Sequence, residues 1–379
     1  MLFFILIPFL FFGCDPFVTD FDLSEPTIGY ISSSISEVSV ADSVKVMTWN
    51  IRFGSGRTSW FGDSCGERVI INQSVILDTL SKICQYIKDE NIDILLLQEV
   101  DASSKRSGYI DQIQYILNNT DLNYGTYASM WQADYIPSDG LGKVDVGNAI
   151  LSKWPISDAE RIQLPLRSDQ DPLKKYFYLR RNLIKALIDL PNDDDFYIVN
   201  IHATAFATDD TKQKQVDTYK SILENLDSEG YSFVTGGDLN SIPPIKSGGD
   251  IYYGDYCSLD ICQNEVLHPL DSSGNTIHLE GSFFDNFEGE LVLMEELYNN
   301  YSAAISLEDI SHDHFTHSTW NTSHIGSDKL YWDRKLDYLF TNNINGKWKW
   351  LDNSSRTHQD VWMLSDHAPV SGILVRTID

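Results

Sequence analysis

The feature that most constrains the fold of this chain is a set of apolar, strand-like runs that each end in a polar residue. Three of them are Met47–Arg52, Leu97–Val100 and Gly237–Asn240, and two more follow at Lys335–Tyr338 and Ser365–Pro369. Strands that each deliver one polar residue at their end predict a sheet edge where oxygen atoms converge. Buried carboxylates are costly without a cation, and oxygen-rich sites without thiolates suit magnesium or calcium.

The order and spacing of these motifs, with His202 between the second and the third, resemble the endonuclease/exonuclease/phosphatase superfamily. That superfamily includes deoxyribonuclease I, abasic-site endonucleases, inositol-phosphate phosphatases and bacterial sphingomyelinases. The resemblance covers residues Val44 to Val375 and depends on all the motifs together, because a piece such as Gly237–Asn240 is unspecific alone. It implies an α/β fold, a four-layer sandwich of two packed mixed β-sheets flanked by helices, as in deoxyribonuclease I.

The hydrophobic pattern favours the same architecture. Apolar residues that recur every three or four positions predict helices at 74–88, 109–117 and 216–226. β-rich runs predict strands at 44–51, 93–97, 147–152, 182–190, 196–203, 233–235, 336–341 and 370–375. Pro191 and the acidic residues after it separate two of these runs and predict a hairpin. Strands in hairpins with helices between some of them indicate two packed sheets with helices outside.

Length and composition favour one catalytic domain over residues 44–379. No Pro/Gly/Ser-rich linker divides the motifs, and a hydrophobic content of 42% is ample for a core. Residues 244–279 are predicted to be an irregular insertion, and loops inserted near a catalytic edge often set substrate choice. The insertion holds Cys257 and Cys262, the favoured disulfide pair in an exported protein. Cys84 lies on the apolar face of a helix and is interpreted as a buried thiol, with a disulfide between Cys65 and Cys84 as the alternative.

The chain is strongly acidic. Its formal net charge is −27, from 28 basic and 55 acidic residues. Affinity for a polyanion comes largely from Lys and Arg side chains that displace counterions, so this charge disfavours charge-driven binding to nucleic acid. It does not exclude a nuclease, because a bound divalent cation supplies positive charge locally. The favoured interpretation of the charge is solubility outside the cell.

Residues 1–13 are predicted to be a signal peptide of the lipoprotein type. Residues 1–12 are almost wholly apolar, too short to span a bilayer, which takes about 20 residues, but suited to a signal-peptide core. Gly13–Cys14 resembles a bacterial lipobox, so Cys14 is expected to carry lipid and to become the mature N-terminus. An ordinary cleaved signal and a wrongly assigned start are the alternatives, since no Lys or Arg precedes the apolar run.

Residues 14–43 are rich in Ser, Thr, Asp and Glu and are predicted to be a flexible tether. An acylated Cys14 and this tether place the protein outside the cytoplasm. It would be anchored by its N-terminal lipid to a bacterial membrane, facing either the periplasm or the cell surface.

The resemblance assigns the metal-binding residues. Glu99 directly follows the buried run Leu95–Leu97 and is the best candidate ligand, because a carboxylate there needs a cation or the surface. Asn50 offers a neutral oxygen to the same ion, or its NH₂ group to a phosphate, and Asp366 is a further acid on the metal side. The expected cofactor is Mg²⁺, with Mn²⁺ or Ca²⁺ as alternatives.

The resemblance also assigns the residues that handle protons. His367 is the expected general base and Asp337 its carboxylate partner, since an imidazole oriented by a carboxylate accepts a proton near neutral pH. His202 follows an apolar strand and is expected to contact the scissile phosphate or to protonate the leaving group.

Further polar residues are predicted to bind the phosphate and the attacking water. Asp238 and Asn240 lie two apart and therefore on the same side of an extended segment. One of them would orient the water while the other bonds a phosphate oxygen or the metal shell. Of the pair Arg180–Arg181, Arg181 is the candidate phosphate contact. The HxHxxH run His312–His317 is interpreted as a solvated loop on the substrate side, in preference to a transition-metal site.

These predictions describe a divalent-metal-dependent phosphoesterase, with a phosphodiester as the favoured substrate, that uses in-line attack by water. The enzyme is expected to be nuclease-like or sphingomyelinase/phospholipase C-like, acting on nucleic acid, a phospholipid headgroup or a small phosphodiester. The alternatives are a phosphomonoesterase and a non-catalytic binding module of the same fold. Glu99, Asp238 and His367 are all present, which argues against the module. No protein partner is evident, and a monomer is expected.

Overall fold

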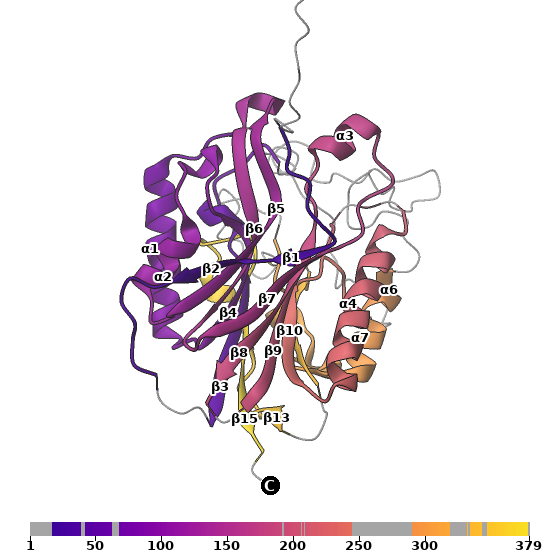
Figure 1. The fold of residues 1–379 in the computed structure, drawn as a ribbon. Helices are drawn as coiled ribbons and strands as arrows, with labels where there is room; N and C mark the ends of the chain where they lie inside the picture. Colours follow the sequence, from indigo (N-terminus) through magenta and orange to yellow (C-terminus); the bar gives the residue numbers. More distant parts are fainter. Residues whose placement is uncertain are drawn as a thin grey trace, which may run out of the picture.

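Two packed β-sheets form the centre of the protein, with helices on their outer faces (Figure 1). The computed structural model describes residues 17–38, 42–62, 68–191, 193–205, 207, 209–244, 290–318, 332, 334–342 and 347–377. Cys14 and the predicted insertion after Pro244, including its two cysteines, lie outside the described residues. The predicted four-layer α/β sandwich is confirmed.

The first sheet joins the first and last parts of the chain. Its strands pair antiparallel except for β3 and β4, which run parallel. In spatial order they are β13 (Trp348–Trp350), β15 (Val370–Arg376), β3 (Ser43–Asn50), β4 (Ile94–Asp101), β6 (Gly142–Ser152), β5 (Tyr124–Ile136) and β2 (Ile28–Ile31), with β14 (Arg356–Thr357) paired to β15.

The second sheet is built mainly from the middle of the chain. The predicted hairpin is confirmed, because β8 and β9 pair antiparallel, and β9 then runs parallel to β10. In spatial order the strands are β1 (Ser24–Pro26), β7 (Ile156–Gln163), β8 (Asn182–Leu190), β9 (Asp193–His202), β10 (Ser232–Asp238), β12 (Asp337–Thr341) and β11 (Ser302–Ala303).

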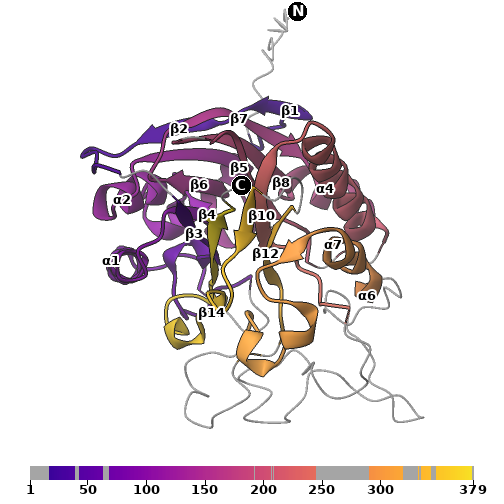
Figure 2. The same ribbon diagram turned by 90° about the horizontal axis from the view of Figure 1, so that it is seen from below.

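The helices form the two outer layers (Figure 2). Two of them, α1 (Gln73–Asp89) and α2 (Gln112–Asn119), cover the first sheet, and α4 (Thr211–Ser228), α6 (Glu290–Leu293) and α7 (Glu295–Asn300) cover the second. A short helix, α3 (Pro172–Phe177), precedes β8. Single 3₁₀ turns lie at η1 (Arg52–Gly54), η2 (Lys105–Ser107), η3 (Ser138–Gly140), η4 (Leu307–Asp309), η5 (His312–His314) and η8 (Gln359–Val361). None of the described helices has the length and apolar character needed to cross a bilayer.

Three apolar layers hold the sandwich together. One lies between α1 and the first sheet around Trp49, one between the sheets around Phe196, and one between the second sheet and α4 around Tyr219. The alternation of each strand sends successive side chains to opposite layers. Cys84 on α1 is a free, buried thiol, as predicted.

The segment predicted to be a flexible tether is ordered over its described part. Ser24–Pro26 pairs with β7 at the edge of the second sheet, and Ile28–Ile31 pairs with β5 at the edge of the first. Before them, Val18 forms a β-bridge with Ala133. The tether prediction is therefore wrong for residues 17–38. Composition alone does not reveal that two sheet edges nearby offer backbone partners for this segment.

Candidate active site

Five strands bring polar residues to one end of the sandwich. In the second sheet Asp238 pairs in register with His202 of β9 on one side and with Asp337 of β12 on the other. In the first sheet the last residue of β3, Asn50, pairs with Gln98 of β4. The two sheets meet at this end, because Asn50 Nδ2 donates a hydrogen bond to Asp238 Oδ2 over 3.0 Å.

Two glycines allow Asp238 to sit so close to its neighbours. A Cβ atom on Gly236 would lie 2.0 Å from the carbonyl oxygen of Tyr338, and one on Gly237 would lie 2.0 Å from that of Ile201. Gly237 also has φ +137°, which L-residues rarely adopt. The sequence Gly-Gly-Asp therefore places the carboxylate between two strands where a larger residue would not fit.

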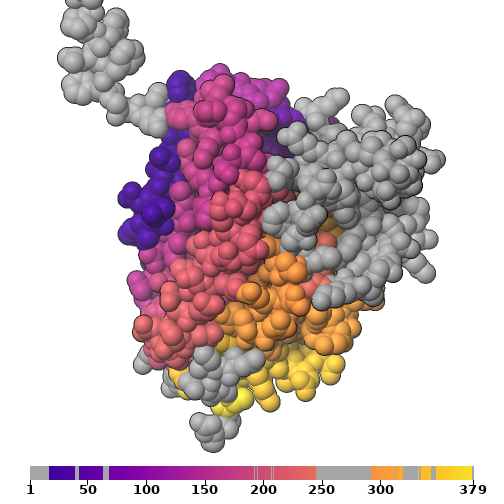
Figure 3. Space-filling view, turned by 90° about the vertical axis from the view of Figure 1, so that its right-hand side faces the viewer, coloured from indigo at the N-terminus to yellow at the C-terminus, as the bar shows by residue number. Residues whose placement is uncertain are grey.

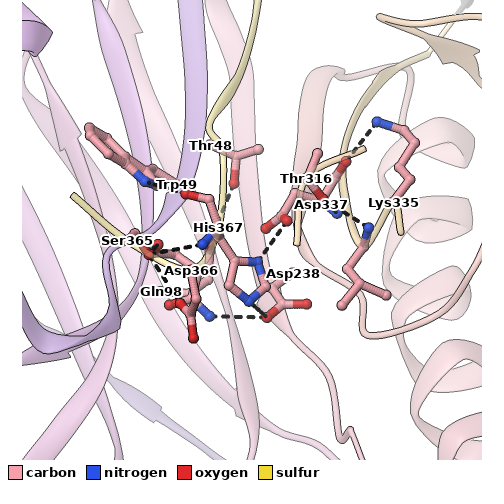
Figure 4. Close-up of polar contacts among 12 residues, drawn as sticks. Thr48, Trp49, Gln98, Asp238, Thr316, Lys335, Asp337, Ser365, Asp366 and His367 are labelled. Carbon is pink, nitrogen blue, oxygen red and sulfur yellow. Dashed lines mark hydrogen bonds and ion pairs between the residues drawn. The ribbon is translucent and has the colours of Figure 1, made fainter. Parts of the chain in front are cut away.

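His367 lies beside two of these carboxylates (Figure 4). Its Nδ1 is hydrogen-bonded to Asp337 Oδ2 at 2.8 Å, and its Nε2 lies 3.7 Å from Asp238 Oδ2. The backbone on either side is fixed as well, since the Trp49 indole donates to the His367 carbonyl and Ser365 Oγ accepts the His367 N–H. The predicted pairing of His367 with Asp337 is thus present.

The charges around His367 determine where a proton resides. Burial alone would lower the pKa of His367, but the negative charges of Asp337 and Asp238 outweigh it and raise that pKa to about 10. Burial raises the pKa of Asp238 to about 7, with the charge of Asp337 adding to the rise and the charge of His367 opposing it. His367 and Asp238 therefore share a proton near neutral pH and titrate as a pair.

His202 is the second histidine of the site and is neutral. Burial, followed by the positive charges of Arg181 and His367, lowers its pKa well below the usual value. Its Nε2 lies 3.3 Å from Asp238 Oδ2 and 4.0 Å from Glu99 Oε1. Its Nδ1 is buried and has no hydrogen-bond partner in the described part of the chain.

Glu99 and Asn240 are held in strained backbone conformations. Glu99 has φ +54° and lies where the register between β4 and β6 shifts, so the irregularity turns its side chain out of the ladder. Asn240 has φ +46°, and its N–H and Nδ2 donate to Asp238 Oδ1 and to the Ala203 carbonyl. Strained non-glycine residues of this kind cluster at functional sites.

The remaining predicted residues have different surroundings. Asp366 Oδ2 forms an ion pair with Arg52 Nε at 3.1 Å. Burial opposes ionisation of Asp366, but Arg52 lowers its pKa to about 2.

The two adjacent arginines point to different places. Arg180 binds Asp20, away from the site, at 3.2 Å. Arg181 is buried and faces the site, where its charge acts on His202, and its Nε has no hydrogen-bond partner among the described residues.

Several residues at the site escaped the sequence analysis. His317 was placed on a solvated loop, yet it is buried and its ring meets the His367 ring at 4.9 Å between centroids, so that prediction is wrong for His317. Lys212 on α4 donates to the Asn240 carbonyl, and Lys335 donates to the Asp337 carbonyl, both at 3.0 Å. No local pattern marked these lysines, because the contacts that they make are with residues distant in sequence or with backbone carbonyl groups.

The donor set fits a hard divalent cation. It offers carboxylate and amide oxygens and imidazole nitrogens without thiolates, and Asp337 Oδ1 is buried with no hydrogen-bond partner in the described residues. One ligand atom each from Asp238, Asp337 and His367 lie within 4.8 Å of one another. Glu99 is the more exposed carboxylate, with 28% of its side chain accessible.

Comparison with known proteins agrees with this geometry. A family model described as the endonuclease/exonuclease/phosphatase family matches residues 47–367. A solved endonuclease/exonuclease/phosphatase from Beutenbergia cavernae is similar with TM-score 0.54 and 16% identity over 88% of this chain and 72% of that chain. A solved endonuclease/exonuclease/phosphatase from Bacteroides vulgatus is similar with TM-score 0.50 and 15% identity over 88% of this chain and 99% of that chain. A functionally unknown protein from Enterococcus faecalis has the same TM-score and identity over 88% of this chain and 100% of that chain.

These identities show the fold alone. No curated protein matches the sequence.

Proposed function

Because this chain belongs to the endonuclease/exonuclease/phosphatase family, we propose that it hydrolyses a phosphoric ester, with a phosphodiester as the favoured substrate, in a reaction that needs a divalent cation. The observation that carries the proposal is the position of Asp238 between His202 and Asp337, within reach of His367. Buried titratable groups of opposite charge in one cluster are typical of catalytic sites and costly elsewhere.

The chain's own residues supply proton transfer. The attacking water gives up a proton to the pair formed by His367 and Asp238, and Asp337 stabilises the imidazolium through Nδ1. Neutral His202 lies on the other side of Asp238 and can donate from Nε2 to a phosphoryl oxygen or to the leaving oxygen. The leaving oxygen regains a proton from the pair of His367 and Asp238, whereas His202, which is neutral, supplies a hydrogen bond and keeps its own proton.

The phosphate is held by neutral and cationic donors. Arg181 Nε has no hydrogen-bond partner in the part of the chain that the structure describes, and both the Asn50 side chain and the Asn240 backbone N–H donate to the Asp238 carboxylate. Such positioned donors stabilise charge that develops on phosphoryl oxygens. A Mg²⁺ ion, or Mn²⁺ or Ca²⁺, would be held by Glu99 with Asn50 and would neutralise charge on the phosphoryl oxygens. In this proposal Asp366 acts indirectly, because Arg52 occupies its carboxylate.

A panel of phosphoesters tests the function. Bis-p-nitrophenyl phosphate, p-nitrophenyl phosphate, plasmid DNA and phosphatidylcholine vesicles would each be incubated with Mg²⁺, Ca²⁺, Mn²⁺ or EDTA, with His367→Ala as the matched inactive control. We expect diester hydrolysis that EDTA abolishes. Hydrolysis of the monoester alone would favour a phosphomonoesterase. No hydrolysis of any ester would favour the binding module.

Calorimetry tests the cation site separately from activity. We expect Glu99→Gln to weaken Mg²⁺ binding sharply and Asp337→Asn to leave it nearly unchanged. The reverse result would place the ion among Asp238, Asp337 and His367, which the geometry also allows.

We further propose that the protein is exported, anchored by lipid on Cys14 to a bacterial membrane, and monomeric. The support is the apolar run at residues 1–12 followed by Gly13–Cys14. Mass spectrometry of the native N-terminal peptide is expected to find acylated Cys14, and Cys14→Ser is expected to move the protein to the soluble fraction. An unmodified peptide running through Cys14 would exclude the anchor. Light scattering of the detergent-solubilised protein tests the monomer.

A further inference from the structure

An exposed apolar surface lies at the end of the sandwich that carries α3. Its members are Phe17, Tyr135, Leu173 and Phe177, called here the aromatic rim. Phe17 contacts Tyr135 and Phe177 with ring centroids 6.4 and 6.3 Å apart. Leu173 and Phe177 are four residues apart on α3 and share one face of the helix. Exposed fractions of 41% for Phe17, 50% for Tyr135 and 69% for Leu173 make this an accessible surface rather than a core.

The aromatic rim adjoins the candidate active site. Phe177 precedes Arg181 by four residues, and Arg181 Nη1 contacts Met130 Sδ on β5, five residues before Tyr135. The neighbouring Arg180 N–H donates to the Met130 carbonyl at 2.5 Å, which fixes the end of α3 against β5. Figure 1 shows α3 and the turn between β5 and β6 at the same upper end of the molecule. A surface bound to the aromatic rim would therefore lie beside the candidate active site.

The sequence indicates which surface the rim faces. The chain enters the described structure at Phe17, within the rim, and Cys14, where we propose that lipid is attached, lies three residues before it. Phe17 is held in place because Val18 bridges Ala133 and the Thr19 N–H donates to the Gln132 carbonyl. In the space-filling view these first described residues, in indigo, lie at the surface against magenta residues of the middle chain (Figure 3). A lipid attached at Cys14 would keep the rim close to the bilayer that the lipid enters.

Two lysines lie beside the rim, together with exposed acidic residues such as Asp20, Asp134 and Asp171. Lys174 and Lys175 on α3 are exposed, and neither ammonium group forms an ion pair with a carboxylate of the described residues. The chain as a whole carries a net charge of −27. Aromatic rings beside lysines are the residues that rest in the headgroup region of a bilayer, and lysines there are attracted to anionic lipid.

We propose that the aromatic rim docks on the surface of a lipid bilayer and turns the candidate active site toward that surface. The rings and Leu173 enter the headgroup region, and Lys174 and Lys175 meet anionic headgroups. This proposal requires no particular phosphoester as the substrate, and it concerns the folded domain rather than the lipid on Cys14. It would stand if the proposed hydrolysis failed.

Photo-cross-linking of the full chain tests the docking directly. The protein would be reconstituted on phosphatidylcholine vesicles with phosphatidylglycerol, containing a phosphatidylcholine whose acyl chain carries a diazirine. We expect cross-linked peptides that contain Tyr135 and Leu173, in addition to any peptide from residues 14–16. Cross-links confined to residues 14–16 would overturn the proposal, because the bilayer would then hold only the anchored end of the chain.

A matched pair of variants makes the test specific. Leu173→Ser is expected to lower cross-linking at the Tyr135 and α3 peptides about tenfold, as expected for withdrawing one leucine side chain from an apolar contact. The control is Leu351→Ser, the same substitution at an exposed leucine that follows β13, at the other end of the sandwich. An equal loss in both variants, with unchanged thermal melting, would overturn the proposal.

The lysines are tested by charge reversal. Lys174→Glu with Lys175→Glu is expected to lower the same cross-links several-fold on vesicles that contain phosphatidylglycerol and to have little effect on pure phosphatidylcholine. An equal effect on both lipid compositions would contradict the part assigned to these lysines.

Discussion

Two buried histidines near the first sheet differ in charge, because His367 is protonated near neutral pH and His358 is neutral. His367 follows the Ser365–Asp366 turn, with Asp337 on Nδ1 and Asp238 near Nε2. His358 precedes η8 and is completely buried, with the Tyr86 hydroxyl at 2.7 Å from Nδ1 and Ser371 Oγ at 2.7 Å from Nε2. Each ring also meets another ring edge-on, His317 in the first case and Tyr86 in the second.

The pKa values follow from these neighbours rather than from burial. Burial lowers the pKa of both histidines, and for His358 it prevails and brings the pKa to about 4, although Glu90 opposes it. For His367 two close carboxylates reverse the effect and raise the pKa to about 10. Hydroxyl partners satisfy a neutral ring and make it structural, whereas carboxylate partners hold a proton that can be exchanged with a substrate.

The largest expected effect distinguishes the two histidines by function. His367→Ala is expected to lower kcat for a diester by about 10²–10⁴-fold, the usual loss on removing a general base, with the fold retained. His358→Gln is expected to leave kcat within about threefold of wild type, because its ring nitrogens bond Tyr86 and Ser371, neither of which is assigned a role in the reaction. Steady-state kinetics on both purified variants, with circular dichroism as the control for folding, checks this. Wild-type turnover in His367→Ala would remove the assigned mechanism.

The two histidines should also give stability opposite slopes with pH. The folded pKa of His358 lies below its unfolded value, so the unfolded chain binds more protons and stability is lost as pH falls from 6.5 toward 4. At about 1.4 kcal/mol per unit this amounts to about 3 kcal/mol. The raised pKa of His367 instead gives stability that is present below pH 6.5 and lost as pH rises toward 10.

Denaturant unfolding in EDTA at several pH values measures both slopes. His358→Gln is expected to flatten the acid side only, and His367→Ala the alkaline side only. An acid slope that persists in His358→Gln would mean that other groups cause it and that the comparison fails for stability.

A smaller effect is expected from removing one carboxylate partner. Asp337→Asn keeps the side-chain shape but removes the charge that raises the pKa of His367. We expect the pKa of His367 to fall and kcat to decrease by about 10–100-fold, as is usual for a partner that orients another catalytic group. Histidine NMR titration and kinetics would be compared with His367→Ala. A loss as large as that of His367→Ala would mean that Asp337 acts directly.

The sequence predicted the site better than the edges of the sheets. Asn50 and Asp238 each end a strand and Glu99 follows the apolar run Leu95–Leu97 within β4, so their convergence followed from local pattern. Strand β5 was missed because its pairing with β6 shifts register twice, which interrupts the period of two. The partners of β1 and β2 lie more than 90 residues away along the chain, so nothing local marked these short strands.

The same reasoning explains why the environment of each histidine escaped the sequence analysis. His317, Lys335 and Arg52 act on the site through contacts with residues that are distant in sequence or through buried charge, and an HxHxxH run suggested a solvated loop instead. A motif indicates which side chains gather at an edge. It does not indicate which of them pair, and the pairing determines the protonation states.

The smallest expected effect tests whether the ring beside each histidine matters. The His317 and His367 rings meet at an interplanar angle of 69°, and an edge-on aromatic contact is worth about 0.5–1.5 kcal/mol. His317→Ala is therefore expected to lower kcat by no more than about tenfold, through a less restricted His367 ring. His317→Phe restores a ring and should recover most of the loss, because the contact needs an aromatic edge rather than an imidazole. If His317→Phe is as impaired as His317→Ala, the imidazole of His317 itself takes part in the reaction, and proton exchange is not confined to the pair of His367 and Asp238.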